Sequence, residues 1–299
     1  LYKMKLQEML ELAAKSNNCI EEMHKNFRPT PFLSCLVEGC IEKAEEVNAG
    51  GAKYNSSGFQ GVGLADVSDS FWAIERVVFQ EQKYTLVEFA NIIKNNFEGH
   101  ESLRAHIQNK VEKFGQDKPQ LDHFTTKISE MYSSLVTNLY HQRGGRYLPG
   151  YWTMTTHQGF GKYTNATPNA RLRGETLANG ISPSLGNEIH GPTAALNSGA
   201  KVHPELVGNG YVLNQKVDQD SAKGERGNVI LEGLLKGYFE QGGMQVQFNI
   251  LDPKVLMAAK KDPKKYKDLV VRISGYSAYF NDLTEEMKNE LIDRNTHNV

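Results

Sequence analysis

The chain has 299 residues, of which 39% are hydrophobic and 23% are charged, a composition typical of a globular protein. Its 34 Lys and Arg residues nearly balance its 35 Asp and Glu residues, so the net charge of −1 predicts no nucleic-acid or membrane-surface partner. No run of about 18 apolar residues occurs, so no transmembrane helix is predicted.

The three cysteines, Cys19, Cys35 and Cys40, form no CxxC pair. They indicate neither a disulfide framework nor a zinc site, and a reducing cytoplasm is the expected compartment. Residues 1–16 have the pattern of an amphipathic helix and do not resemble a signal peptide. Because the sequence begins with Leu1 rather than with a methionine, we expect it to start inside a longer protein.

Apolar residues recur at helical spacing in several segments of the first half of the chain. The predicted helices span residues 1–16, 32–45, 68–79, 85–97 and 121–141. The segment that separates the second helix from the third is rich in Gly, Asn and Ser, which predicts a loop. Residues 1–145 are therefore expected to be mostly helical.

The composition changes after this helical half. Residues 147–161 are rich in Tyr, Trp, Thr and Phe, which favour a strand. Residues 165–192 contain many turn-forming residues, and a loop of this length inside a domain is usually functional or disordered. Helices are predicted again at 193–202 and 228–240, and a strand at 244–251.

The C-terminal segment contains a strand-like apolar run at 269–280, which is interrupted by Gly275. A last helix is expected at 283–296, with Asp282 as its N-cap and Glu285 three residues later. Such a glycine commonly marks a bulge or a tight bend in a strand. Taken together, the elements predict a mixed α/β fold.

One long segment near the C-terminus carries a specific resemblance. It reads VVRISGYSAYFNDLTEEMKNELIDR and resembles the radical-bearing signature of the glycyl radical enzymes, the pyruvate formate-lyase-like family. Earlier blocks, among them PFLSCLVEGCIEKAEEVNAGGAKYN, GLADVSDSFWAIERVVF and GGMQVQFNILD, are similar to successive blocks of that family in the same order. The resemblance extends from about residue 28 to the end of the chain.

The resemblance implies an α/β fold that is the C-terminal part of a ten-stranded α/β barrel, with the glycyl radical loop inserted towards the barrel centre. Residues 1–145 would be a mostly helical part of the barrel domain, and the N-terminal part of the enzyme would be absent. Residues 146–299 would be a glycyl radical domain with its radical loop at 270–280.

The resemblance further implies that Gly275 carries a stable backbone radical. An unpaired electron shared between the amide nitrogen and the carbonyl needs a planar α-carbon, which a Cβ would crowd. We expect the flanking side chains to enclose the radical in a dry pocket. These side chains are Ile273, Tyr276, Tyr279 and Phe280, although ordinary core packing is the alternative for the two tyrosines.

Arg272 is expected to anchor this loop through hydrogen bonds to carbonyl groups or to a carboxylate, without taking part in the chemistry. His157, in TTHQGFG, and His190, in NEIHGP, are further candidates for pocket contacts or loop support. The histidines lack the spacing of metal ligands, so no metal is expected on this chain.

In the family, the glycyl radical generates a thiyl radical on a cysteine, which abstracts hydrogen from the substrate. In the family this cysteine lies in a G-C-x-E-like loop, and Cys40 lies in a run of the same form, GCIE. It shares the spacing of one helical stripe with Phe32, Leu36 and Ala44, so we interpret Cys40 as a buried structural residue. The thiyl cysteine is then expected upstream of Leu1, and this chain alone would hold a radical without turnover.

Glu38 is the candidate substrate-binding residue. It lies in the apolar stretch PFLSCLVEGC, which resembles the pattern of the 4-hydroxyphenylacetate decarboxylases of the family. The resemblance implies that Glu38 binds the phenolic hydroxyl and accepts its proton while CO2 leaves, with p-cresol as the product. A solvated carboxylate on a helix surface is the alternative.

The sequence therefore predicts a glycyl radical lyase, with arylacetate decarboxylation favoured. One alternative is dehydration or C–N cleavage of a small diol or amino alcohol, and another is a non-catalytic spare part that restores a damaged enzyme. The resemblance implies a partner that installs the radical, an activating enzyme with S-adenosylmethionine and an iron–sulfur cluster. A homo-oligomer, with or without a small partner subunit, in the cytoplasm of an anaerobic organism is the expected setting.

Overall fold

The computed structural model describes residues 1–217, 219 and 221–296. Its contacts divide the chain into two units. The first unit contains Leu1–Gln60, Ser129–Gly150 and Glu205–Gly210, and the second contains Gly61–Ile128, Tyr151–Pro204 and Tyr211–Val299. Helix α7, Pro119–Thr137, and the 3₁₀ turn Pro204–Leu206 have residues in both units.

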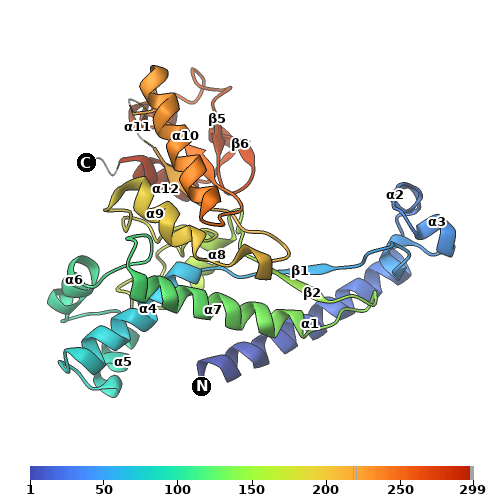
Figure 1. Ribbon diagram of the computed structural model, residues 1–299, viewed down its shortest axis with the longest axis horizontal. Helices are drawn as coiled ribbons and strands as arrows, with labels where there is room; N and C mark the ends of the chain where they lie inside the picture. Colours follow the sequence, from blue (N-terminus) through green and yellow to red (C-terminus); the bar gives the residue numbers. More distant parts are fainter. Residues whose placement is uncertain (218, 220, 297–299) are drawn as a thin grey trace. The chain divides into compact units, whose positions relative to one another are not determined.

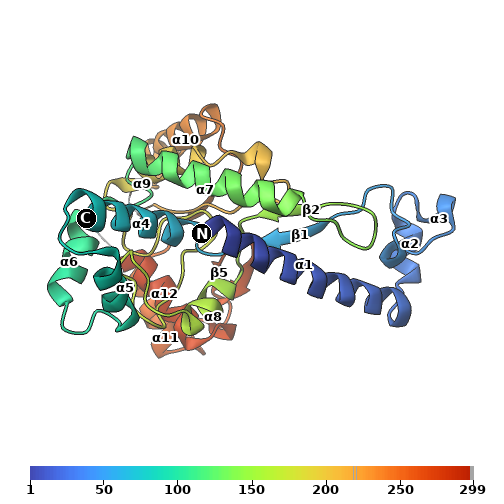
Figure 2. The same cartoon turned by 90° about the horizontal axis from the view of Figure 1, so that it is seen from below.

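The first unit holds a parallel strand pair on which the long helix α1 packs (Figure 2). Its elements are α1 Tyr2–Phe27, α2 Pro31–Leu36, α3 Cys40–Lys43, the 3₁₀ turn Val47–Ala49, β1 Ser57–Gln60 and β2 Tyr147–Gly150. The ring of Phe59 in β1 stacks on that of Tyr147 in β2, with ring centres 4.3 Å apart. Asn17 of α1 donates a hydrogen bond of 2.9 Å to the Tyr147 hydroxyl, which fixes the helix to the strand pair.

The second unit carries two further strand pairs, and the C-terminal pair is labelled in Figure 1. Its elements are α4 Leu64–Ile74, the π-helix Glu75–Gln80, α5 Leu86–Lys94, α6 Glu101–Lys110, α8 Thr156–Tyr163, α9 Gly191–Ala200, β3 Asn214–Lys216, α10 Gly224–Glu240, β4 Gln247–Asn249, α11 Pro253–Lys261, β5 Val270–Arg272, β6 Ser277–Tyr279, the 3₁₀ turn Phe280–Asp282 and α12 Glu285–Thr296. Strands β3 and β4 are parallel, and α10 lies on the crossover that parallel strands require. Strands β5 and β6 form an antiparallel hairpin.

The C-terminal hairpin shares one apolar cluster with α11 and α12. The buried members are Leu256, Ala259, Val271, Ile273, Phe280, Met287, Leu291 and Ile292. Side chains alternate along β5, so Val271 and Ile273 face this cluster while Arg272 between them is exposed. Each large apolar side chain buried here contributes about 1.5–3 kcal/mol relative to exposure, so the cluster holds both arms of the hairpin.

The helix predicted at 32–45 is wrong as a continuous element. The chain leaves the helix between α2 and α3, because Val37 is extended and Gly39 has a φ of +100°. A Cβ at Gly39 would lie 2.6 Å from the amide nitrogen of Lys53, so the close approach of that segment requires glycine.

This break also removes the helical stripe on which the interpretation of Cys40 depended. Cys40 is buried, but Phe32 and Leu36 are 80% and 70% exposed. The Cys40 thiol packs against the backbone of Gly51, where an added Cβ would lie 3.1 Å from the sulfur atom. The burial of Cys40 therefore comes from the following loop and not from a regular helix.

The strand predicted at 147–161 is correct only for Tyr147–Gly150. The later part forms helix α8, whose buried residues are His157 and Gly161. An added Cβ at Gly161 would lie 2.5 Å from the Glu175 carbonyl oxygen, so α8 packs closely on the long loop that follows. This packing overrides the strand propensity of the aromatic and Thr residues.

The expected N-cap of the last helix is also wrong. Asp282 ends a 3₁₀ turn, and α12 begins at Glu285. Thr284 provides the cap, because its hydroxyl accepts a hydrogen bond from the amide of Met287 at 3.3 Å. The long loop is confirmed, since no helix or strand lies between α8 and α9. Helix α6 was not predicted.

Helix α5 offers a test of local stability at its N-terminus. The Thr85 hydroxyl accepts a hydrogen bond from the Glu88 amide at 3.2 Å, and the Glu88 carboxylate accepts one from the Thr85 amide at 2.8 Å. We expect Thr85→Ala to lower the free energy of unfolding by about 1 kcal/mol in urea titrations followed by circular dichroism. Thr85→Ser keeps the hydroxyl and is the control; an equal loss in both variants would contradict the capping role.

Candidate functional site

Gly275 lies in the turn that joins β5 to β6. The amide of Ile273 donates a hydrogen bond of 3.0 Å to the carbonyl of Tyr276, which closes the turn. Gly275 has a φ of +80°, a backbone conformation that residues with a side chain rarely adopt. An added Cβ would meet the Val212 side chain at 3.4 Å, so the need for glycine comes mainly from the backbone angle.

A buried side chain holds the amide of this glycine. The Gly275 N–H donates to Gln247 Oε1 at 3.0 Å, and Gln247 Nε2 donates to Asn214 Oδ1 at 2.8 Å. Asn214 Nδ2 in turn donates to Asn179 Oδ1 at 3.2 Å. Three amide side chains from β4, β3 and the long loop therefore lead away from Gly275 in a continuous row.

The row continues to the C-terminal helix. Thr153 Oγ1 donates to Asn179 Oδ1 at 2.9 Å and lies 3.1 Å from His157 Nδ1. His157 Nε2 lies 3.0 Å from Glu290 Oε2 in α12. We call these residues the Gly275 network; its members beyond the glycine are Gln247, Asn214, Asn179, Thr153, His157 and Glu290, all buried.

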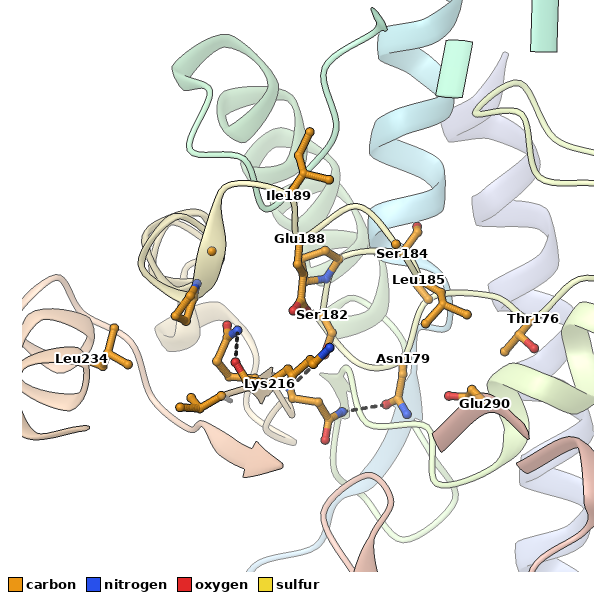
Figure 3. Close-up of a pocket in the computed structure, with 18 of the residues that line it drawn as sticks. Thr176, Asn179, Ser182, Ser184, Leu185, Glu188, Ile189, Lys216, Leu234 and Glu290 are labelled. Atoms are coloured by element: carbon orange, nitrogen blue, oxygen red, sulfur yellow. Dashed lines mark hydrogen bonds between the residues drawn. The ribbon is translucent and has the colours of Figure 1, made fainter. Parts of the chain in front are cut away.

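The network borders a cavity of about 650 Å³ in the second unit (Figure 3). The long loop supplies much of its lining, and the segment from β3 to α10 supplies the rest together with Glu290 of α12. Figure 3 shows Asn179 at the edge of this cavity, hydrogen-bonded to a neighbouring lining residue, with Glu290 beyond it. The predicted role of the long loop thus gains a physical basis, because the loop both lines a cavity and carries one member of the network.

Two aspartates of α4 fasten the long loop. Asp66 accepts hydrogen bonds from the Ala178 amide at 2.6 Å and from the Ser184 hydroxyl at 3.0 Å. Asp69 accepts from the Phe114 amide at 2.7 Å and from Asn187 at 3.2 Å. These contacts fix the loop at Ala178, Ser184 and Asn187, within the segment that lines the cavity.

Both carboxyl groups are fully buried, and desolvation raises their pKa values. Burial raises the pKa of Asp69 to about 7, against the lowering effect of the nearby Lys113 ammonium. The pKa of Asp66 is raised for the same reason. This pair was not predicted, although two aspartates three residues apart in the apolar run GLADVSDSFWAIERVVF could have indicated buried carboxylates.

The residues that flank Gly275 lie only partly as expected. Ile273 and Phe280 are buried, and Tyr276 packs partly buried against the same cluster. Tyr279 is 51% exposed because it lies on the other face of the hairpin, so its role in a dry pocket stays a prediction. Gly275 itself is exposed among the residues that the structure describes.

Arg272 supports the hairpin through a different acceptor from the one expected. Its Nη1 donates to the Ser277 hydroxyl at 3.1 Å, across the strand pair. His157, a candidate for pocket contact or loop support, lies inside the Gly275 network, whereas His190 is exposed at the start of α9.

Glu38 belongs to the first unit and lies in the turn between α2 and α3, not on a helix. Its carboxylate is 71% exposed and forms an ion pair of 2.7 Å with the Lys53 ammonium group. A substrate contact of Glu38 therefore stays a prediction, and the contacts in this chain are those of a solvated surface carboxylate.

Comparisons with known proteins show which family the chain belongs to. Residues 1–161 match the family described as pyruvate formate lyase-like, and residues 177–281 match the family described as glycine radical. The chain is 36% identical to the trans-4-hydroxy-L-proline dehydratase of Clostridioides difficile, over 98% of this chain and 37% of that protein. It is 30% identical to the indoleacetate decarboxylase of Tractidigestivibacter scatoligenes, over 94% of this chain and 35% of that protein.

Among solved structures, the glycerol-bound B12-independent glycerol dehydratase from Clostridium butyricum is similar with a TM-score of 0.96 and 39% identity. That match covers 98% of this chain and 37% of the other. The chain therefore belongs to the pyruvate formate-lyase-like family of glycyl radical enzymes, and its fold corresponds to a part of the α/β barrel of that family. It spans little more than a third of the length of these relatives.

Two further properties concern the described part of the chain. Within it, no group of three His, Cys, Asp or Glu side chains could hold a metal ion. None of its helices combines the length and the apolar character needed to cross a membrane.

Proposed function

We propose that Gly275 is the residue that carries the stored radical. The supporting observation is its turn, in which a glycine with a φ of +80° has its amide held by Gln247 at 3.0 Å. When present, the radical supplies a site that takes up and returns a hydrogen atom. The protein contributes a Cα with no side chain to crowd the planar form, on a hairpin anchored by a buried apolar cluster.

We further propose that the whole protein is a glycyl radical lyase, and specifically a dehydratase of a small hydroxylated compound. Two of the relatives described above are dehydratases, with 36% and 39% identity to this chain, and the decarboxylase has 30%. These similarities favour loss of water over loss of CO2. The preference for an arylacetate as the substrate is therefore replaced by the alternative of a small alcohol.

The activating partner follows from the same proposal. A radical S-adenosylmethionine enzyme with an iron–sulfur cluster would remove one hydrogen atom from the Gly275 Cα. The exposed position of Gly275 in this chain is compatible with such access. A cysteine outside this chain would then pass the radical to the substrate.

The proposed reaction is tested by turnover of the whole protein after anaerobic activation. Glycerol and trans-4-hydroxy-L-proline are the dehydration substrates, and 4-hydroxyphenylacetate is the decarboxylation substrate. We expect a dehydrated product from at least one of the first two, no p-cresol from the third, and no product from Gly275→Ala. Formation of p-cresol without any dehydrated product would contradict the dehydratase proposal, and in that case Glu38→Gln should reduce the yield of p-cresol.

A further inference from the structure

The amide of Gly275 is held by a side chain rather than by the hairpin backbone. Its acceptor, Gln247, lies 28 residues earlier in strand β4 and is 5% exposed. The Gln247 carboxamide uses its oxygen towards the glycine and its nitrogen towards Asn214, so both ends of the group are engaged. A carboxamide with both ends bonded has one orientation, which fixes the position of the acceptor for the glycine N–H.

The partners of Gln247 are themselves fixed. The Asn214 side chain donates to Asn179, and the backbone amide of Asn214 donates to the Ser182 hydroxyl at 2.8 Å. Asn179 Oδ1 also accepts from Thr153. Each of these polar groups is buried, so breaking one bond leaves a desolvated donor or acceptor without a partner.

The contact between His157 and Glu290 links the network to α12. The Thr153 hydroxyl proton is directed to Asn179, so His157 Nδ1 must donate to the Thr153 oxygen. The contact of 3.0 Å between His157 Nε2 and Glu290 then requires one more proton between the imidazole and the carboxyl group. This proton ties α8 to the same helix that packs on the hairpin core.

We propose that Gln247 is a positioning residue for Gly275 and that the network through Glu290 anchors it. The network keeps the exposed turn seated, so its rupture would accompany any movement that brings the Gly275 Cα to another protein. This inference extends the proposed function of Gly275 and names the residues that regulate access to it. It concerns the chain before activation and can therefore be tested without a radical.

The first test is hydrogen–deuterium exchange of the Gly275 amide in the unactivated chain, followed by mass spectrometry of peptides that cover the turn. Gln247→Met removes the acceptor at similar volume, and we expect exchange at least tenfold faster. Gln247→Glu keeps an oxygen for the glycine but cannot donate to Asn214, so a smaller acceleration is expected. Gln245→Met is the control, because Gln245 accepts from the Leu213 amide at 3.0 Å, whereas the Gly275 amide donates to Gln247.

The second test addresses the far end of the network. We expect Glu290→Ala to accelerate exchange at Gly275, while Glu286→Ala, at an exposed position of the same helix, leaves it unchanged. Circular dichroism identifies any variant that fails to fold. Unchanged exchange in folded Gln247→Met would overturn the positioning role, and equal exchange in the two glutamate variants would overturn the anchor at α12.

These outcomes separate the inference from the proposed function. If activation yields no radical but exchange responds as expected, the network positions the turn and the assignment of the radical to Gly275 fails. If the radical forms but folded Gln247→Met and Glu290→Ala leave exchange unchanged, the reverse holds.

Discussion

Gly275→Ala is expected to abolish the electron paramagnetic resonance doublet that we expect from the unchanged chain after anaerobic activation. The doublet reports coupling of the unpaired electron to the single hydrogen left on the glycine Cα. The Cβ of an alanine crowds the planar form of that carbon. The alanine must also adopt a φ near +80°, which costs about 1–2 kcal/mol. Air should then cleave the activated unchanged chain at residue 275 and leave the variant intact, as measured by mass spectrometry.

Gly242→Ala is the matched control for backbone strain. Gly242 has a φ of +95°, and an added Cβ there would meet no atom within 4 Å. The strain is therefore similar, while the radical position is untouched, so the doublet should persist. A doublet in activated Gly275→Ala, or a chain that stays whole in air despite a measured radical, would contradict the assignment.

The position of Gly275 could be predicted because its requirements are local. A glycine between apolar strand residues predicts a turn or a bulge, and the hairpin β5–β6 places it in the turn. The apolar alternation also predicts which neighbours are buried, as it does for Val271 and Ile273. The same alternation places Tyr279 on the exposed face of the hairpin.

The Gly275 network could not be predicted in this way. Its members come from segments up to 137 residues apart, from Thr153 to Glu290, and most of them are uncharged amides and hydroxyls with no motif. Only His157 was singled out, and as a contact or support whose partners could not be named. Periodicity identifies apolar faces, whereas a buried polar row depends on donor and acceptor geometry that only the folded chain brings together.

The break between α2 and α3 could not be predicted for a related reason. Apolar spacing by four suggested one helix, but the backbone of Lys53 approaches Gly39 too closely for any side chain. The glycine was visible in the sequence, and the residue that it accommodates was not. Contacts between distant segments override helical spacing here, as they override strand propensity in α8.

The buried carboxyl group of Asp69 gives the second large effect, a dependence of stability on pH. Its folded-state pKa of about 7 lies above the ordinary value of 3.8 because burial disfavours the charged form. Between these two pH values the unfolded chain has lost the proton that the folded chain retains. The folded state therefore binds more protons, and the free energy of unfolding falls as the pH rises through this window.

We expect Asp69→Asn to remove this pH-dependent loss. As the pH rises from 4 to 8, the unchanged chain should lose up to about 4 kcal/mol of unfolding free energy relative to the variant. Burial lowers the pKa of Lys113, which acts in the opposite sense, so the comparison between the two chains, rather than one pH profile, isolates Asp69. Urea titrations at several pH values measure it, and Asp268→Asn, at an exposed position, controls for the loss of one negative charge. If the two chains differ by the same amount at every pH, the pKa of Asp69 is the same in the folded and unfolded states, and the prediction is contradicted.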